Sequence, residues 1–305
     1  MVYSKTRRRI IRTSADDRIF YLFVSIILIL FTAVVLYPII YVVSASFSSG
    51  VAVSTGKVIL WPVDPTLDGY SGIFAYKKVP IGFRNSIFIT VIGTIINVSM
   101  TLMAAYPLSR RNFQGRKIYT TLFIITMFFS GGLIPSYILV TQLKIVNTFW
   151  AILLPGAIST YNMIITRTYF MSSIPNDILE ASQIDGCSNI RYFFIILLPL
   201  SKPIIAVIAL FYGVDHWNSW FYAMLYLRNP DLHPLQLILR DILMMASFAM
   251  NDFRSRDART IELLLNMAEL LKFSLIVVSS IPVIIVYPFI QKYFIKGVLI
   301  GSLKG

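Results

Sequence analysis

The side chains best suited to chemistry are a neighbouring acid and imidazole, Asp215 and His216, with a second imidazole at His233. An imidazole beside a carboxylate can act as a general base, and two histidines can contribute to a metal site. However, the pattern lacks a Cys partner and a His-x-x-x-His spacing, and no nucleophile motif accompanies it. We therefore predict no catalytic residue and no metal site, and we expect that the chain is not an enzyme.

The composition indicates which environment these residues occupy. The chain has 305 residues, of which 57% are hydrophobic and 13% charged, and its mean hydropathy is +0.74. Such a chain is too apolar for a soluble globule, so it belongs in a bilayer. The net charge of +13 comes from basic residues that flank apolar segments, not from aromatic-interleaved patches, which argues against nucleic-acid binding.

Long apolar stretches recur along the sequence, each near or above the ~20 residues that a helix needs to cross a membrane. They are residues 19–43, 86–108, 118–140, 150–171, 193–214 and 273–294. We predict an all-α integral membrane protein with six transmembrane helices in one domain, residues 19–305, after a basic tail, residues 1–18. The basic start also fits a signal peptide, but the first apolar run exceeds the usual length of about 7–15 residues.

Basic residues cluster in the short loop after the second predicted span, at Arg110, Arg111, Arg116 and Lys117. Such loops face the cytoplasm, which places both termini inside and makes residues 44–85 and 215–272 outer regions. The sequence thus predicts a multi-pass membrane protein with this basic loop on its cytoplasmic side.

Two predicted spans carry interruptions. Residues 130–135 include two glycines and a proline, which either line a transport pathway or reflect the general abundance of these residues in membrane helices. Lys202 and Pro203 interrupt the fifth span, where Lys202 is either functional or able to reach the inner surface, as Arg167 can in the fourth.

A polar segment, residues 174–191, separates the fourth and fifth spans on the predicted inner side. Pro175 suits a helix start and Gly186 a helix end. Ile174, Ile178 and Ala181 should share one face, and such a short amphipathic helix could press into a groove on another protein. The alternative is an ordinary turn between two membrane helices.

Particular residues of this segment carry a family resemblance. Glu180, Ala181 and Gly186, followed by Ile196, Leu198 and Pro199, resemble the EAA signature of ABC importer permease subunits in type and spacing, whereas Ser182 departs from the usual second alanine. The run 287–305, the pair Trp217 and Asn218, and the pair Asn85 and Ser86 are similar to the maltose-type carbohydrate permeases. Within that family the chain looks closest to the branch for aldouronates, pectin fragments or alginate.

The resemblance implies a type I ABC importer permease fold and a set of partners. These are a second homologous permease, a dimer of ATP-binding subunits, an extracytoplasmic solute-binding protein that meets the outer region 215–272, and a carbohydrate substrate, with membrane lipid around them. The helix at 175–186 would couple this chain to the ATPase. The implied ATPase-coupling residues are Glu180, Ala181, Ser182, Asp185, Gly186 and Pro199.

The sequence contains no Gly-x4-Gly-Lys-Ser/Thr loop, so ATP hydrolysis should occur on the partner subunit, and we expect no cofactor bound by this chain. Candidate residues of the sugar pathway are Asn97, Tyr161, Asn162 and Trp217, although such residues are more often packing or interfacial residues. The rival interpretation is an ion-coupled secondary carrier, but such carriers place ionisable groups at membrane depth, and the six spans contain no Asp or Glu.

Overall fold

The structure is a computed structural model that describes residues 15–251, 270–288 and 291. Every regular element in these ranges is helical, which confirms the all-α prediction, and no strand occurs among them. The helices are α1 (Ala15–Ser46), α2 (Gly50–Ser54), α3 (Asp68–Ala75), α4 (Lys78–Ser109), α5 (Arg116–Phe128), α6 (Leu133–Gln142), α7 (Trp150–Leu153), α8 (Thr160–Ser173), α9 (Asn176–Ile184), α10 (Asn189–Arg191), the π-helix η1 (Tyr192–Leu197), α11 (Leu198–Leu200), α12 (Lys202–Asn218), α13 (Phe221–Tyr226), the 3-10 helix η2 (Pro230–Leu232), α14 (Leu235–Asn251) and a last helix, Leu270–Pro288.

Three of these helices, α1, α4 and the last helix, are each long and apolar enough to cross a membrane. Two bent pairs bring the number to as many as five: α5 with α6, at 114°, and Asn189–Leu200 with α12, at 81°. The chain is therefore a multi-pass membrane protein.

The fourth predicted span, 150–171, does not form one helix. It divides into α7 and the 14-residue α8, and a helix of that length reaches only about 21 Å, short of the hydrocarbon core at about 30 Å. Pro155 and Gly156 lie between the two helices and explain the break, because both residues favour turns over helix.

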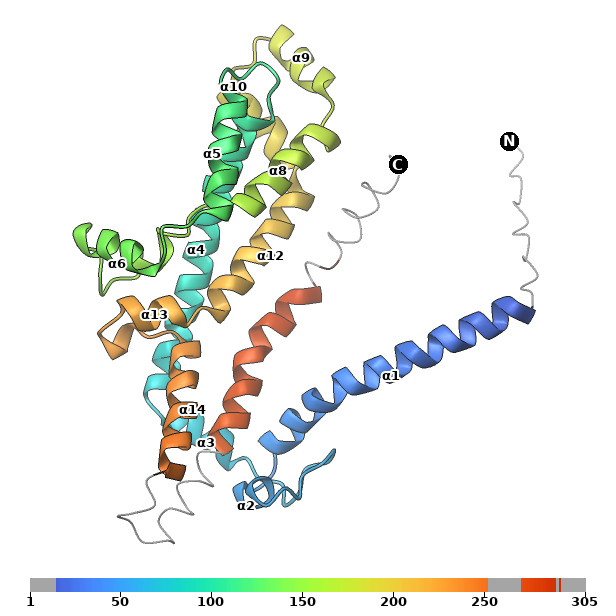
Figure 1. Cartoon of the computed structure of the whole chain (residues 1–305), viewed down its shortest axis with the longest axis vertical. Coiled ribbons are helices and arrows are strands. Elements are labelled where there is room, and N and C mark those ends of the chain that lie inside the picture. Colours follow the sequence, from blue (N-terminus) through green and yellow to red (C-terminus); the bar gives the residue numbers. More distant parts are fainter. Residues whose placement is uncertain (1–14, 252–269, 289–290, 292–305) are drawn as a thin grey trace.

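The predicted break in the third span is confirmed. Gly132 has a φ of +85° at the start of α6, a backbone conformation that residues with a side chain rarely adopt. The 114° bend between α5 and α6 follows from this turn and sends α6 sideways from the rest of the molecule (Figure 1).

The bend near Lys202 has a proline on each side. Pro199 and Pro203 both lack the N–H that would continue the helical ladder, so the chain passes through the π-helix η1 and turns at Ser201. The buried Ser201 hydroxyl donates to the Leu197 carbonyl at 2.7 Å. Lys202 is exposed at the bend, away from the buried core.

The largest core cluster is built around α4, which packs most extensively on α12 and α8 (Figure 1). Its members come from α4, α8, η1 and α12, with fully buried side chains at Met163, Tyr192, Leu197 and Ile208. The helix α4 begins at Lys78, earlier than the predicted residue 86, because Pro80 lies in its first turn, where a missing N–H costs nothing. Thus α4 extends from one end of the bundle to the other.

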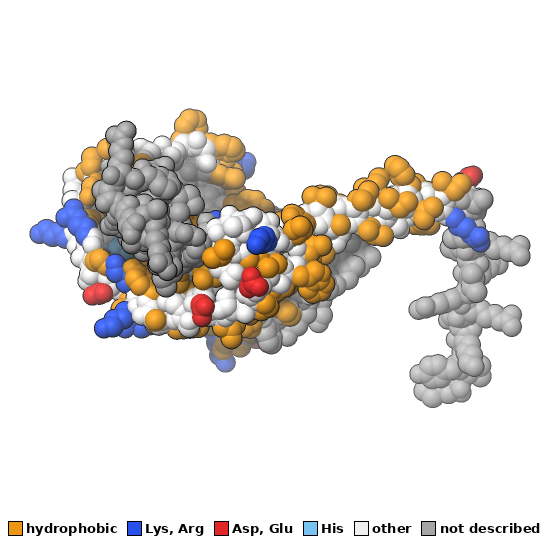
Figure 2. Space-filling model, turned by 90° about the horizontal axis from the view of Figure 1, so that it is seen from below, with side chains coloured by type: hydrophobic (Ala, Val, Ile, Leu, Met, Phe, Trp, Pro, Cys, Tyr) orange, Lys and Arg blue, Asp and Glu red, His pale blue; other side chains and the backbone are white. Residues whose placement is uncertain are grey.

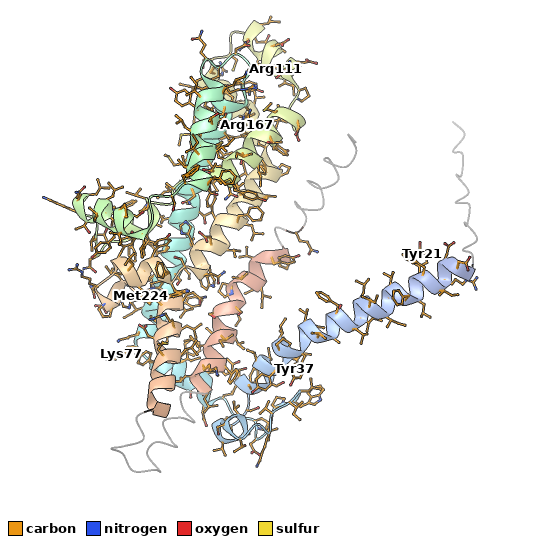
Figure 3. The ribbon with its side chains drawn as sticks, viewed as in Figure 1. Tyr21, Tyr37, Lys77, Arg111, Arg167 and Met224 are labelled. Carbon is orange, nitrogen blue, oxygen red and sulfur yellow. The ribbon has the colours of Figure 1, made fainter. Side chains whose placement is uncertain are left out.

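In contrast, α1 stands apart from this bundle. The helix starts at Ala15, so residues 15–18 belong to it and not to the predicted tail; residues 1–14 lie outside the described ranges. None of the most apolar window of α1 is buried. Figure 2 shows hydrophobic side chains along its length, and Figure 3 shows Tyr21 far from the other helices.

The region 215–272, predicted to be an outer region, starts with the last turn of a helix. Residues 215–218 continue α12, and the helix expected from residue 235 is present as α14. Residues 252–269 lie outside the described part of the chain. The helices α2, α3 and α14 lie at the end of the molecule opposite α9 (Figure 1).

Candidate docking site

The helix α9, which the sequence predicts to dock on a partner, forms where it is expected. Pro175 is its N-cap, with an extended ψ of 139°, and Gly186 follows its C-cap with a φ of +74°. The Cys187 N–H donates to the Ser182 carbonyl at 2.9 Å, and the Gly186 N–H to the Gln183 carbonyl at 3.0 Å. These two bonds form a Schellman motif, which ends the helix at the predicted glycine.

The apolar stripe of α9 faces inward. Ile174 is 7% exposed, and Ile178 and Leu179 pack on the core cluster of α4, α8 and α12. Ala181 is exposed and does not share their buried face. The stripe therefore attaches α9 to its own bundle, and the expected use of that stripe against a partner is wrong. Ile184 lies on the outward face of α9 and is 87% exposed.

The predicted coupling residues separate into three groups. Glu180, Ala181, Asp185 and Gly186 are exposed on or after α9. Ser182 is 6% exposed, and its hydroxyl donates to the Leu179 carbonyl at 2.7 Å, so it contributes to packing and does not face a partner. Pro199 is exposed in α11, beyond η1, where it contributes to the helix bend.

A polar hollow of about 500 Å³ lies between the end of α4 and α9. Glu180, Gln183 and Asn176 line it from the α9 side, and Arg110 and Arg111 line it from the other. The hollow thus presents both charges beside the exposed face of α9.

The segment after α9 is attached to α4 through Arg110, the C-cap of α4. The guanidinium carbon lies 4.7 Å from the centroid of the Tyr106 ring and 4.9 Å from that of the Tyr192 ring. These two rings stack with a centroid distance of 6.3 Å. Arg110 Nε and Tyr192 Oη are buried without a hydrogen-bond partner in the described residues, so these ring contacts add to the apolar packing of Phe193 and Leu197 on the core cluster.

The segment before α9 is attached to the same turn of α4. Arg167 Nε in α8 donates to the Leu108 carbonyl at 2.9 Å. That carbonyl belongs to the last turn of α4, where carbonyl groups lack partners within the helix. Figure 3 shows Arg167 and Arg111 at the α9 end of the molecule. The chain segments before and after α9 are therefore both attached to residues 106–110, at the end of α4. The sequence indicated Arg167 only as a charge near the inner surface, and no sequence signal indicated the ring contacts of Arg110.

Three of the four predicted pathway residues are buried, and two of these three have side-chain hydrogen-bond partners. Asn97 is 2% exposed, and its Nδ2 donates to the Gly156 carbonyl at 2.9 Å. Asn162 is 5% exposed. Trp217 is 5% exposed, and its Nε1 donates to the Ser279 carbonyl of the last helix at 2.9 Å. Tyr161 differs from these three, since it is 56% exposed next to the break between α7 and α8.

The break between α7 and α8 is held by a group of buried, hydrogen-bonded side chains, here called the polar seam. The sequence did not indicate this group. His216 Nε2 lies 3.3 Å from Asn97 Oδ1, and the Tyr212 hydroxyl lies 2.7 Å from Thr101 Oγ1 while accepting the Ser159 N–H at 2.9 Å. A Cβ at Gly93 would meet His216 Nε2 at 2.5 Å, so only glycine allows this close approach.

The geometry argues against a catalytic centre at the two histidines. His216 is buried in the polar seam, Asp215 is exposed, and His233 Nε2 lies 3.3 Å from the Leu227 carbonyl. No group of metal-binding side chains occurs within the described residues.

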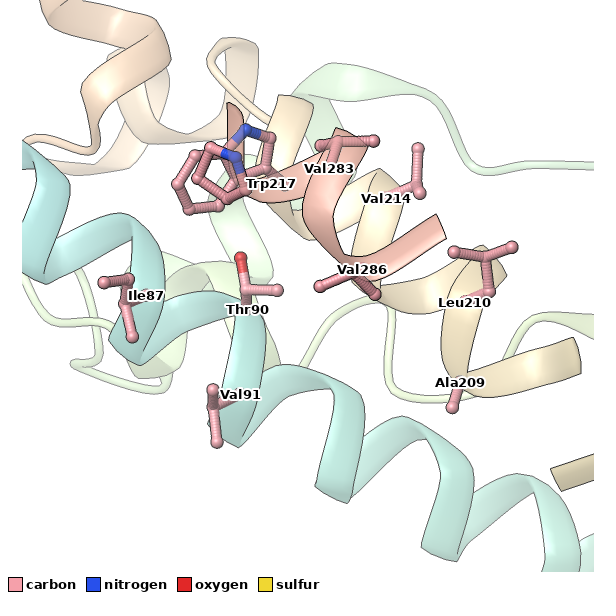
Figure 4. Close-up of a pocket in the computed structure, with 11 residues that line it drawn as sticks. Ile87, Thr90, Val91, Ala209, Leu210, Val214, Trp217, Val283 and Val286 are labelled. Atoms are coloured by element: carbon pink, nitrogen blue, oxygen red, sulfur yellow. The ribbon is translucent and has the colours of Figure 1, made fainter. Parts of the chain in front are cut away.

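An apolar pocket of about 260 Å³ lies elsewhere, between α4, α12 and the last helix (Figure 4). Ile87, Leu210, Trp217 and Val283 are among its lining residues, and nearly all of its surface is apolar. Thr90 contributes the one hydroxyl among its lining residues, and none of these residues is ionisable.

Comparison with known proteins accounts for this combination of a membrane bundle and an exposed end helix. Residues 97–300 match the family described as "Binding-protein-dependent transport system inner membrane component". The polygalacturonan/rhamnogalacturonan transport system permease protein YtcP of Bacillus subtilis is 39% identical over 289 residues, covering 95% of this chain and 99% of that one. Protein LplC of the same organism is 38% identical over 273 residues, covering 90% of each chain.

Solved structures give the same answer. The crystal structure of a bacterial ABC transporter involved in the import of the acidic polysaccharide alginate matches with a TM-score of 0.81 and 35% identity, over 92% of this chain and 98% of that chain. The resemblance to ABC importer permeases is thus confirmed, and with it the prediction of a transport component instead of an enzyme. This chain belongs to the family of binding-protein-dependent transport system inner membrane components and is a permease subunit of an ABC importer.

Proposed function

We propose that this permease subunit imports oligo- or polysaccharide fragments into a bacterial cell, and that acidic fragments are the first class to test. The observation that carries the proposal is the similarity over nearly the whole chain to a polygalacturonan/rhamnogalacturonan permease and to an importer of an acidic polysaccharide. Matches of this length cover more than nine tenths of the chain, and not just the segment around α9.

The test is uptake of radiolabelled oligogalacturonides and alginate oligomers by cells with and without the gene, with malto-oligosaccharides as the neutral control. Uptake of an acidic oligomer that requires this chain supports the proposal. Uptake limited to the neutral sugar would refute the acidic class, and uptake that persists after ATP depletion would refute ATP-driven import.

We further propose six spans with both termini in the cytoplasm. Five spans are described above, and α7 and α8 together would form the sixth as one broken span. The short basic loop with Arg110, Arg111, Arg116 and Lys117 supports a cytoplasmic position for the α9 end. Cys187, the one cysteine of the chain, is a natural reporter at this end. A membrane-impermeant maleimide should label it in inside-out vesicles and not in right-side-out vesicles.

In this orientation, the exposed face of α9 would dock into an ATPase subunit, and ATP would be hydrolysed there and not on this chain. The support is the exposure of Glu180, Ala181, Ile184 and Asp185 on a helix that projects from the bundle. Closure of the ATPase pair would then move α9, and the contacts of Arg110 and Arg167 would pass that movement to α4. Alternating access would follow from rocking of this bundle against a second one.

A second, homologous permease would complete the transport pathway. The α1 window is entirely unburied and α5 has no buried residue, so both leave apolar surface available to a partner or to lipid. A solute-binding protein would deliver the sugar at the opposite end, near α13 and α14. Of the four pathway candidates, Tyr161 fits sugar contact best, because it is exposed and aromatic, whereas the others are buried.

A further inference from the structure

A second hollow, here called the basic hollow, opens at the α9 end where α5 begins. Its volume is about 740 Å³. The lining residues are Arg111, Phe113, Gly115, Arg116, Lys117, Ile118 and Met171. Three of these residues are cations, none is a carboxylate, and most of the others are apolar.

The electrostatics of the basic hollow are one-sided. Arg116 and Lys117 occupy the first turn of α5, which contains no acidic residue. The N-terminal end of a helix is already positive through its backbone dipoles, so these cations add to that potential. Within the described residues, the ion pair between Arg240 and Asp241 lies in α14, toward the opposite end of the molecule. No ion pair among these residues involves the cations of the hollow. An anion in the hollow would relieve the repulsion between them.

Apolar surface continues from the basic hollow along α5. Ile118 is 66% exposed, Leu122 53% and Ile125 46%. A soluble anion such as phosphate would leave Phe113, Ile118 and Met171 unused, whereas a phospholipid provides a negative headgroup and hydrocarbon in one molecule. This combination occurs where a spanning helix leaves the membrane.

We propose that the basic hollow binds the headgroup of an anionic phospholipid from the inner leaflet, with its acyl chains along the exposed face of α5. The inference rests on the proposed orientation in the membrane and does not depend on the sugar or on the ATPase contact. An acidic surface of the ATPase is the competing occupant. Lipid is favoured because apolar side chains share the hollow with the cations and continue into the exposed apolar surface of α5.

The test uses the full transporter in native membranes supplied with photoreactive phosphatidylglycerol or photoreactive phosphatidylcholine. Labelled peptides are mapped by mass spectrometry. The variant Arg111→Gln/Arg116→Gln/Lys117→Gln removes the three charges of the hollow. Its matched control, Lys77→Gln/Lys78→Gln/Arg84→Gln, removes three exposed cations from the opposite end, where Figure 3 shows Lys77. Maleimide labelling of Cys187 verifies that each variant is inserted in the same orientation.

We expect phosphatidylglycerol to label residues 111–118 in the unmodified protein, and this labelling to fall at least about tenfold in the hollow variant and not in the control. Excess inorganic phosphate should not displace it. Equal labelling by phosphatidylcholine, unchanged labelling in the hollow variant, or displacement by phosphate would overturn the lipid site. Labelling that arises only after the ATPase is stripped away would assign the hollow to that protein instead. If the lipid labelling fails while Cys187 is still labelled from the cytoplasmic side, the lipid site is refuted and the proposed orientation and function are unaffected.

Discussion

The contact of Arg110 with Tyr106 and Tyr192 provides the sharpest test of how α9 communicates with the bundle. A cation over an aromatic ring contributes about 0.5–1 kcal/mol when exposed and about 2 kcal/mol when desolvated. Arg110 is half-buried and lies over two rings at 4.7 and 4.9 Å, so its removal should weaken the attachment by about 1–3 kcal/mol. Because each 1.4 kcal/mol corresponds to a factor of ten, the variant Arg110→Ala should shift the equilibrium toward the detached arrangement about tenfold. The sugar transported per ATP should therefore fall.

The assay measures sugar uptake and phosphate release in the same proteoliposomes, reconstituted with the partner permease, the ATPase and the binding protein. Arg110→Lys should give an intermediate ratio, because it keeps the charge and loses the planar guanidinium. The matched control is Arg18→Ala, which removes an exposed guanidinium from α1, the helix that stands apart from the bundle. A wild-type ratio in Arg110→Ala, or an equal loss in Arg18→Ala, would refute the idea that α4 receives movement through Arg110.

Four further variants and one control test other parts of the structure. Gly186→Pro cannot adopt the φ of +74° and removes the N–H that ends α9, so the ATPase should no longer co-purify. Glu180→Lys should uncouple transport, and both variants should remain inserted. Normal ATP-driven uptake would contradict both expectations. Gly93→Ala places a methyl group 2.5 Å from His216 and should cost about 1–3 kcal/mol in a thermal-unfolding assay, whereas Gly156→Ala meets nothing within 4 Å and should be neutral. Ile184→Glu changes a side chain that is 87% exposed, so it should keep the melting temperature and weaken ATPase binding; a lowered melting temperature with intact binding would show that Ile184 serves the fold.

The sequence predicted those features that depend on local chemistry. Gly186 ends α9 through a left-handed φ, and the glycines before α6 break the third span. Both outcomes follow from backbone preferences of residues close together in the chain. Hydropathy also located the long helices, because a spanning helix needs an unbroken apolar stretch.

Features that depend on distant contacts were not predictable in this way. The spacing of Ile174 and Ile178 indicates a shared face of α9, but it cannot say whether that face meets its own core or a partner. Asn97 and Trp217 read equally well as pathway or packing residues until their partners, Gly156 and Ser279, are known. The break in the fourth span had a local signal in Pro155 and Gly156, which the apolar character of 150–171 outweighed.

The arrangement of these contacts makes α4 the common element of the molecule. With 32 residues it reaches about 48 Å from end to end. Its last turn holds both segments that lead to α9, and its middle holds the break between α7 and α8 through Asn97. Near its start, Asn85 Nδ2 donates to the Asp231 and His233 carbonyls, and Ser86 Oγ accepts the Leu235 N–H at 2.8 Å. A displacement at the docking end can therefore reach the opposite end through one helix, without requiring the weaker contacts of α1 or α6.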